Sequence, residues 1–281
     1  MKISHNTRAR IEVSFLSRLR SSPMTFGELQ ETVDVSEPTA RRALRRLLDR
    51  GLIAIVGSRE STGGRPANVY GLDPDAGALV GVHLELPGLH MVVTNLAGEI
   101  LHQQHISHDY DIDANKAVQE IIRFIREAMA RFGRERVLGV GVAAPGYRDS
   151  SGTILAIGRD PAWQNVPLAA RLQRETNLPV HVENDVDCMA LAALEFDNSI
   201  TLDDFLYLGF TEGVKASLVL NGEVYSGPFG NAGSIGHTTV VPDGPLCSCG
   251  NRGCLEAVAS VRALHSAFEQ RRTTETAASD R

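Results

Sequence analysis

The sequence has no apolar run long enough to cross a membrane. No stretch approaches the roughly 18 consecutive apolar residues that a transmembrane helix needs, and the first residues, MKISHNTRARIE, lack the apolar core of a signal peptide. Internal repeats at solenoid periods and low-complexity tracts are also missing. We therefore expect a globular cytoplasmic protein without a membrane partner, in a compartment that keeps thiols reduced.

Cysteine is scarce, and its placement is informative. Of four cysteines, three (Cys247, Cys249 and Cys254) fall within eight positions, and His237 lies ten residues before the first of them. Three thiolates and one imidazole are a common ligand set for structural tetrahedral Zn²⁺. Free thiols or a disulfide are the alternative, although cysteines one residue apart bridge poorly. We predict that these four residues bind zinc in a closed site that stabilises structure instead of activating water.

Charge is distributed unevenly along the 281 residues. The net charge is −6, yet Met1–Asp75 carries 12 Lys and Arg against nine Asp and Glu, whereas the remainder carries 16 against 25. Hydrophobic residues make up 43% of the chain, which allows an ordinary packed core. This length and asymmetry predict two domains, a basic head over residues 1–75 and an acidic body over residues 76–281.

The head has the pattern of a winged helix-turn-helix. An amphipathic helix is expected within residues 7–20, a short helix over FGELQETV, and a third over SEPTARRALRRLLDR, which begins at Ser36 and is closed by Gly51. The segments LIAIV and VYGL flank GSRESTGGRPAN and predict a hairpin wing. We expect double-stranded DNA to contact Thr39, Arg41 and Arg42 of the third helix and Arg65 at the wing tip. The alternative is a solvated arginine face on a small helical bundle.

The body alternates strand-like and helix-like segments, which predicts an α/β domain. Its last residues, RRTTETAASDR, are expected to be disordered. Strands are expected at residues 78–86, 90–94, 98–107, 137–146, 179–185, 205–210 and 216–225, and helices at 114–132, 168–176 and 188–196.

Five motifs together carry a resemblance to a known family. GGRP in the wing, GVGVAAPG, HVENDVD, GNAGSIGH and CSCGNRGCLE resemble the ROK family, which contains sugar kinases and sugar-responsive transcriptional repressors. The resemblance implies an actin-like, ribonuclease-H-like α/β fold for the body. Since the family's kinases usually lack a DNA-binding head, it points to the repressor branch.

The resemblance also implies a sugar site. The family's sugar contacts fall on Asn184, Asp185, His237 and Glu256, with His237 serving both metal and ligand. In the kinases the aspartate at Asp185 is the general base, and its alternative reading is a helix cap after a strand. Ser234 stands where the family usually has glutamate, which predicts a different ligand preference or none.

Departures from the kinase pattern argue against ATP binding. His83-Leu84-Glu85-Leu86-Pro87 replaces a glycine-rich phosphate loop, and Glu212 and Lys215 occupy a second segment where small residues are expected. Phosphate loops need exposed backbone N–H groups, which a proline lacks. The chain also ends sooner after the cysteine motif than family members do, so we expect a shortened carboxyl end and association into homo-oligomers.

We therefore expect a non-enzymatic transcriptional regulator of the repressor type. It is expected to bind operator DNA as a dimer or dimer of dimers and to respond to a sugar or sugar derivative. Zn²⁺ is the expected structural cofactor, without ATP. The alternatives are an ATP-dependent sugar kinase with Asp185 as base and a ligand-independent DNA-binding scaffold.

Overall fold

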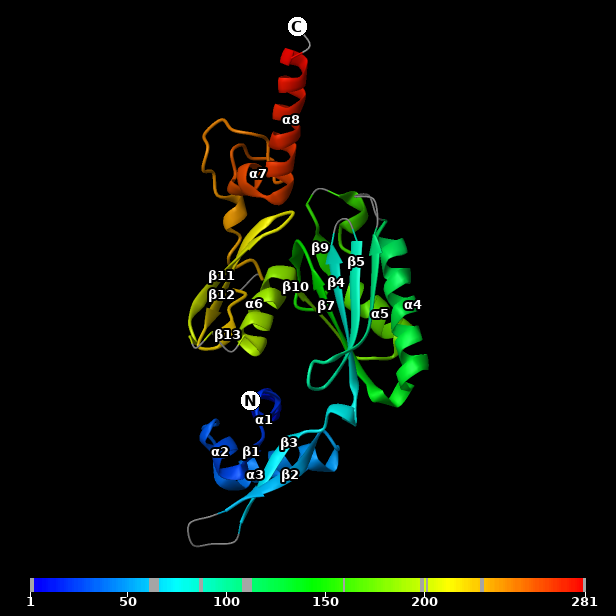
Figure 1. Cartoon of the computed structure of the whole chain (residues 1–281), viewed down its shortest axis with the longest axis vertical. Helices are drawn as coiled ribbons and strands as arrows, with labels where there is room; N and C mark the ends of the chain where they lie inside the picture. The colour runs from blue at the N-terminus through cyan, green and yellow to red at the C-terminus, as the bar shows by residue number, and fades with distance from the viewer. Residues whose placement is uncertain are drawn as a thin grey trace. The chain divides into compact units, whose positions relative to one another are not determined.

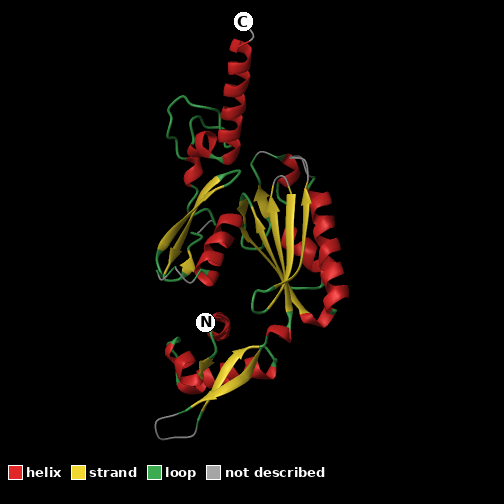
Figure 2. Cartoon of the chain, viewed as in Figure 1, coloured by secondary structure: helices red, strands yellow, loops and turns green. Residues whose placement is uncertain are grey.

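The computed structural model describes residues 3–60, 66–85, 88–107, 113–158, 160–197, 200, 202–227 and 230–279 (Figures 1 and 2). Arg65 and the glycines of the wing tip, as well as Leu86 and Pro87, lie outside these ranges. The chain divides into two compact units. One comprises Met1–Val80, Val92–Gln103 and Arg126–Gly139, and the other comprises Gly81–Met91, Gln104–Ile125 and Val140–Arg281.

The amino-terminal segment forms three helices and a small antiparallel sheet in the order β1-β3-β2. Apolar residues of all three helices meet in one core that includes Phe15, Leu29 and Leu47, each fully buried. The elements are α1 (Ile3–Ser21), β1 (Met24–Thr25), α2 (Phe26–Glu31), α3 (Glu37–Asp49), β2 (Ile53–Arg59) and β3 (Ala67–Leu72).

Local sequence signals explain where these helices begin and end. Thr25 and Glu28 form a capping box that starts α2. Ser36 is the N-cap of α3, but its hydroxyl contacts the Thr39 hydroxyl at 3.0 Å instead of capping a backbone N–H. Gly51, at φ 69°, follows the end of α3 in the left-handed conformation that glycine adopts readily. The predicted helices and hairpin are confirmed, while the pairing of β1 with β3 was not predicted.

The first part of the body is built on a five-stranded sheet in the order β10-β7-β4-β5-β6. The apolar run VLGVGVAA forms β7, which lies between two other strands and pairs in parallel with β10, with Val180 opposite Val140 and Asn184 opposite Ala144. Such a run suits a strand covered on both faces. The strands are β4 (Ala78–Glu85), β5 (Gly88–Asn95), β6 (Ile100–Ser107), β7 (Val137–Ala144) and β10 (Val180–Asn184).

Two helices of this part have the predicted bounds. They are α4 (Ala114–Phe132) and α5 (Leu168–Thr176), whose apolar faces are buried. A short hairpin of β8 (Tyr147–Arg148) and β9 (Ile154–Ala156) follows β7 and was not predicted, because strands this short carry no periodicity.

The remainder contains a second, antiparallel sheet in the order β11-β12-β13, which contacts α6. Its elements are α6 (Asp185–Phe196), β11 (Phe205–Phe210), β12 (Val214–Leu220), β13 (Glu223–Val224), α7 (Leu255–Ala259) and α8 (Val261–Ser279). The expectation of disorder after residue 270 is wrong up to Ser279, because α8 continues through a stretch with good helix formers and neither glycine nor proline. Within the described residues, none of the helices combines the length and apolarity needed to cross a membrane.

Candidate functional site

The predicted DNA-contacting residues of α3 lie together on its outer side. Arg41 and Arg42 are exposed and Thr39 is half-buried. Arg41 donates to Glu37 Oε1 at 2.7 Å, and its guanidinium lies 4.1 Å from the centre of the Phe26 ring. Arg42 donates to the Thr39 hydroxyl at 3.3 Å. Arg42 and Thr39 therefore contact each other, whereas Arg41 contacts Glu37 and Phe26. The fourth predicted contact, Arg65, lies outside the described residues.

Two further arginines, at the end of α3 and at its C-cap, form ion pairs that were not predicted. Arg46 Nε lies 2.5 Å and Arg50 Nη1 3.2 Å from the carboxylate of Glu12 on α1. They tie α3 to α1 and are engaged within the head. Arg45, by contrast, is exposed. The spacing of Arg46 and Arg50, one helical turn apart, was the signal that could have indicated a shared partner.

All five predicted sugar contacts line one cavity of about 820 Å³ in the second unit. Two come from the junction of β10 and α6, two from the start and end of the short helix η4 (Ile235–His237), and one from α7. A volume of this size suits a small ligand. The five residues are Asn184, Asp185, Ser234, His237 and Glu256.

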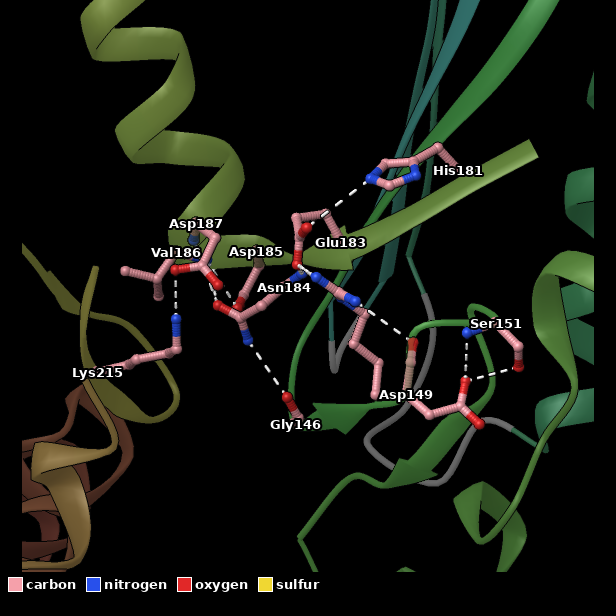
Figure 3. A network of polar contacts seen from close by, with 11 residues as sticks. Gly146, Asp149, Ser151, His181, Glu183, Asn184, Asp185, Val186, Asp187 and Lys215 are labelled. Carbon is pink, nitrogen blue, oxygen red and sulfur yellow. Dashed lines mark hydrogen bonds and ion pairs between the residues drawn. The ribbon is translucent and has the colours of Figure 1, made fainter. Parts of the chain in front are cut away.

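The junction of β10 and α6 presents Asp185 to the cavity. Asn184 is the N-cap of α6: its Oδ1 accepts from the Val186 and Asp187 N–H groups, and its Nδ2 donates to the Gly146 carbonyl at 3.3 Å (Figure 3). Asp185 is the first residue of the helix, so the cap reading for Asp185 is wrong. Burial raises the pKa of Asp185, and the Val186 N–H, His83 and Lys215 oppose that rise. A carboxylate placed in this way can accept a hydrogen bond from a ligand hydroxyl.

A partly buried ion pair between Arg148 and Glu183 supports this junction. Arg148 Nε donates to Glu183 Oε1 at 2.6 Å, and the same oxygen accepts from the Asn184 N–H at 2.9 Å (Figure 3). Burial raises the pKa of Glu183, but hydrogen bonds from His181, Arg148 and the Asn184 N–H outweigh it and lower the pKa to about 2. Glu183 therefore holds β8 and the end of β10, directly before Asp185, in a fixed arrangement.

A second ion pair lies at the cavity wall and was not predicted. Lys215 Nζ of β12 lies 2.5 Å from Asp187 Oδ1 of α6 (Figure 3). The side chains are only 16% and 6% exposed, so both charges are largely removed from water. The sequence marked Lys215 only as unsuited to a phosphate loop, because nothing in the order of residues shows that Asp187 is its partner.

The predicted metal ligands converge. The donor atoms of His237, Cys247, Cys249 and Cys254 all lie within 4.8 Å of one another. Cys249 Sγ is 3.7 Å from Cys254 Sγ, and Cys247 Sγ is 3.7 Å from His237 Nδ1. Tetrahedral ligands at Zn–S of about 2.3 Å and Zn–N of about 2.0 Å stand roughly 3.5 to 3.8 Å apart. The cluster could therefore hold a metal ion, and Nδ1 is the imidazole nitrogen that lies near Cys247 Sγ.

Glu256 connects this cluster to the cavity wall. Its Oε2 accepts from the Val214 N–H at 3.1 Å, and its Oε1 accepts from the Ser248 hydroxyl at 3.2 Å. A Cβ at Gly213 would lie 2.9 Å from Glu256 Oε2, so a larger residue there would require the Glu256 carboxylate to shift. Ser234 donates its hydroxyl to the Asn231 carbonyl at 2.8 Å, which leaves its oxygen able to accept.

Sequence comparison decides the family. The ROK family profile matches residues 80–280, and a helix-turn-helix profile matches residues 3–56. The chain belongs to the ROK family. The predicted fold class, a helix-turn-helix head followed by an actin-like ROK domain, is thereby confirmed.

Both regulators and kinases are similar to this ROK chain. It is 30% identical over 246 residues to the xylose repressor of Caldicellulosiruptor bescii, a match that covers 86% of this chain and 61% of the repressor. It is 32% identical over 188 residues to the glucokinase of Thermotoga maritima, covering 66% of this chain and 58% of the glucokinase. The chain thus spans less than two thirds of the length of these curated relatives.

A solved ROK structure is similar over nearly the whole chain. The crystal structure of a ROK family transcriptional regulator, a homologue of the Escherichia coli MLC protein, aligns with a TM-score of 0.74 at 27% identity. The alignment covers 94% of this chain and 68% of that one. A match of this extent includes the head as well as the ROK domain.

Proposed function

We propose that the protein is a transcriptional regulator that binds operator DNA through its amino-terminal head and responds to a sugar in the cavity. The observation that carries the proposal is the convergence of five predicted sugar contacts on one cavity, in a chain that also has a helix-turn-helix with an arginine-rich outer surface. The similarity to a xylose repressor and to a ROK transcriptional regulator supports the same reading.

The head supplies two kinds of DNA contact. Arg42 and Arg45 are exposed on α3, the helix that enters the major groove in such motifs, and Arg41 is held beside them by Glu37. Guanidinium groups on this surface contact phosphates or base edges. The chain acts as a dimer, and the separation of its two heads must match the spacing of two operator half-sites. Ligand binding favours one arrangement of the body and so changes that separation.

The cavity supplies hydrogen-bond partners for hydroxyl groups. Asp185 accepts, and Ser234 keeps a free acceptor site. Because Nδ1 of His237 faces the cysteine cluster, its Nε2 is left for the ligand. Glu256, held by the Val214 N–H and Ser248, has further lone pairs available.

We propose Zn²⁺ as the ion of the Cys247–Cys249–Cys254–His237 cluster. Four protein ligands leave no open position, so bound zinc supplies structure and no activated water. Its contribution is to fix the loop whose Ser248 hydroxyl donates to Glu256 and to orient the imidazole of His237.

An electrophoretic mobility-shift titration against genomic fragments, with and without candidate sugars, tests the proposal. We expect a specific shift at physiological salt that one sugar alters. Replacing Arg42 and Arg45 together with alanine is expected to lower affinity at least tenfold and to reduce the salt slope by about 2. Arg134→Ala, an exposed arginine outside α3, is the matched control. Failure of every fragment to bind specifically would overturn the proposal.

Sugar phosphorylation is the second candidate function, favoured by the likeness to a glucokinase and by the place of Asp185 at the cavity. We propose that it does not occur, because the segments expected to hold phosphate carry Glu85, Glu212 and Lys215. A coupled ATP-consumption assay over a panel of hexoses checks this. Turnover that disappears in Asp185→Asn would establish the kinase instead.

A further inference from the structure

Three groups of the cavity wall that could bind an anion already have internal partners: Lys215, the backbone N–H groups at the start of α6, and the Val214 N–H before β12. Proteins hold phosphate and carboxylate groups with Lys or Arg side chains, with free backbone N–H groups at helix N-termini, or with N–H groups of tight turns. The cavity has an example of each among the described residues. Each can be followed to the acceptor that it contacts.

The lysine of the cavity wall is neutralised by a carboxylate. Lys215 Nζ lies 2.5 Å from Asp187 Oδ1, and Asp187 is almost fully buried. An anionic ligand that took this ammonium would leave Asp187 as an unpaired charge in a region of low polarity, which is strongly unfavourable. The pair therefore offers no net positive charge to a ligand.

The backbone donors are engaged as well. At the start of α6, the Val186 and Asp187 N–H groups donate to Asn184 Oδ1 at 3.0 and 3.3 Å. At the turn before β12, the Val214 N–H donates to Glu256 Oε2 at 3.1 Å. These two sets of backbone donors are thus occupied by an amide oxygen and a carboxylate of the chain itself.

Fixed negative charges also outnumber positive ones around the cavity. Among its described lining residues, four carry carboxylates, and two carry a permanent positive charge, one of them already neutralised by Asp187. The carboxylates are Glu85, Asp185, Glu212 and Glu256, and the cations are Lys215 and Arg262. The Glu85 carboxylate also lies 3.2 Å from His83 Nδ1 and 3.3 Å from His90 Nε2, so these ring nitrogens contact Glu85 instead of pointing at a ligand.

We propose that the cavity binds an uncharged sugar and rejects its phosphorylated and carboxylated derivatives. The inference rests on the proposed function, because it names the ligand class of the same cavity. Neutral hydroxyl groups can donate to Asp185 and Glu256 without an uncompensated charge, whereas a phosphate dianion meets carboxylates on several sides. The cellular signal is then the sugar before its phosphorylation, and a kinase acting on it would remove the signal.

Isothermal titration calorimetry with purified full chain tests this. A panel of neutral aldoses, including D-glucose and D-xylose, is titrated first, followed by glucose 6-phosphate and glucuronate as charged counterparts. We expect at least one neutral aldose to bind and anionic forms to bind at least tenfold more weakly. An anionic sugar that binds as tightly as its neutral parent overturns the inference while leaving the sensor function intact. Absence of binding by every sugar overturns both, and neutral-sugar binding without DNA binding overturns only the regulator.

A charge-removal pair sharpens the test. Replacing both Glu85 and Glu212 with glutamine removes two carboxylates from the cavity rim. The ratio of neutral-sugar affinity to anionic-sugar affinity should then fall by roughly threefold to tenfold, because the anionic sugar binds more tightly. Glu135→Gln, an exposed carboxylate outside the cavity, is the control and should leave the preference unchanged. Fluorescence of Trp163, the single tryptophan, verifies that the variants are folded. An unchanged preference in the double variant contradicts the inference.

Discussion

Replacing Lys215 with methionine removes the ammonium group that neutralises Asp187. Methionine keeps much of the aliphatic volume, so the main change is the loss of charge. Because Asp187 is 6% exposed and Lys215 16% exposed, water cannot readily replace the lost partner. Breaking a buried pair from one side costs about 3 to 5 kcal/mol, and the lower end applies here because Lys215 borders a cavity.

Urea unfolding measures this cost. Trp163 is fully buried in the same unit as the pair, so its fluorescence reports the unfolding of that unit. With a urea slope of about 2 kcal/mol per molar, a loss of about 3 kcal/mol lowers the midpoint by about 1.5 M. Lys116→Met is the matched control, because Lys116 is exposed on α4, and it should change stability by less than about 0.5 kcal/mol.

The double variant Lys215→Met with Asp187→Leu completes the cycle. Removing both charges should recover most of the lost stability, since a buried pair and an apolar replacement are often close in free energy. A loss below about 1 kcal/mol in Lys215→Met would show that the two charges are not coupled. Lys215 would then be available to an anionic ligand, and the inferred preference for uncharged sugars would lose its main support.

Three further predictions concern other carboxylates. The pKa of Glu183 is about 2, well below its value of 4.5 in the unfolded chain, so Glu183 stabilises the fold above pH 4.5 and loses this effect as the pH falls towards 2. In urea unfolding, Glu183→Gln should therefore lower the free energy of unfolding by about 2 kcal/mol at pH 7 and by almost nothing at pH 2. Burial raises the pKa of Asp185, so Asp185→Asn should stabilise the fold at neutral pH and lose that advantage as the pH falls through the folded-state pKa. The same variant should abolish sugar binding in calorimetry. A stability gain that persists in acid would contradict the burial argument. Glu12→Gln releases Arg46 and Arg50 and should lower the melting temperature of the head with little loss of DNA affinity per folded molecule, whereas a purely DNA-binding role for Arg46 predicts unchanged stability.

The sequence predicted the regular elements of this protein well because their signals are local. The bounds of α4 and α5 agree with the apolar periodicity, and Ser36 and Gly51 mark the ends of α3 as expected. The extension of α8 to Ser279 was missed, since a polar composition was read as disorder although it contained no helix breaker.

The candidate site was predictable only in part. Asp185 and Glu256 are far apart in the chain, so their common cavity followed from the family resemblance and not from spacing. Pairs such as Lys215–Asp187 and Arg46–Glu12 join separate elements, and no periodicity within one element indicates the residue across from it. Their charges could be counted from the sequence, but their partners are set by tertiary packing.

The proposed metal site at His237, Cys247, Cys249 and Cys254 has a consequence for refolding kinetics. Its four donors all come from the stretch between His237 and Cys254, whereas the cavity is lined by residues from β4 to the start of α8. A metal ion that binds there closes only a short loop, which costs little chain entropy compared with assembling the whole body. The loop from His237 to Cys254 can thus acquire its shape early in refolding, before the Val214 N–H contacts Glu256. A chelator present during refolding should then slow recovery of native Trp163 fluorescence more than the same chelator added afterwards reduces it.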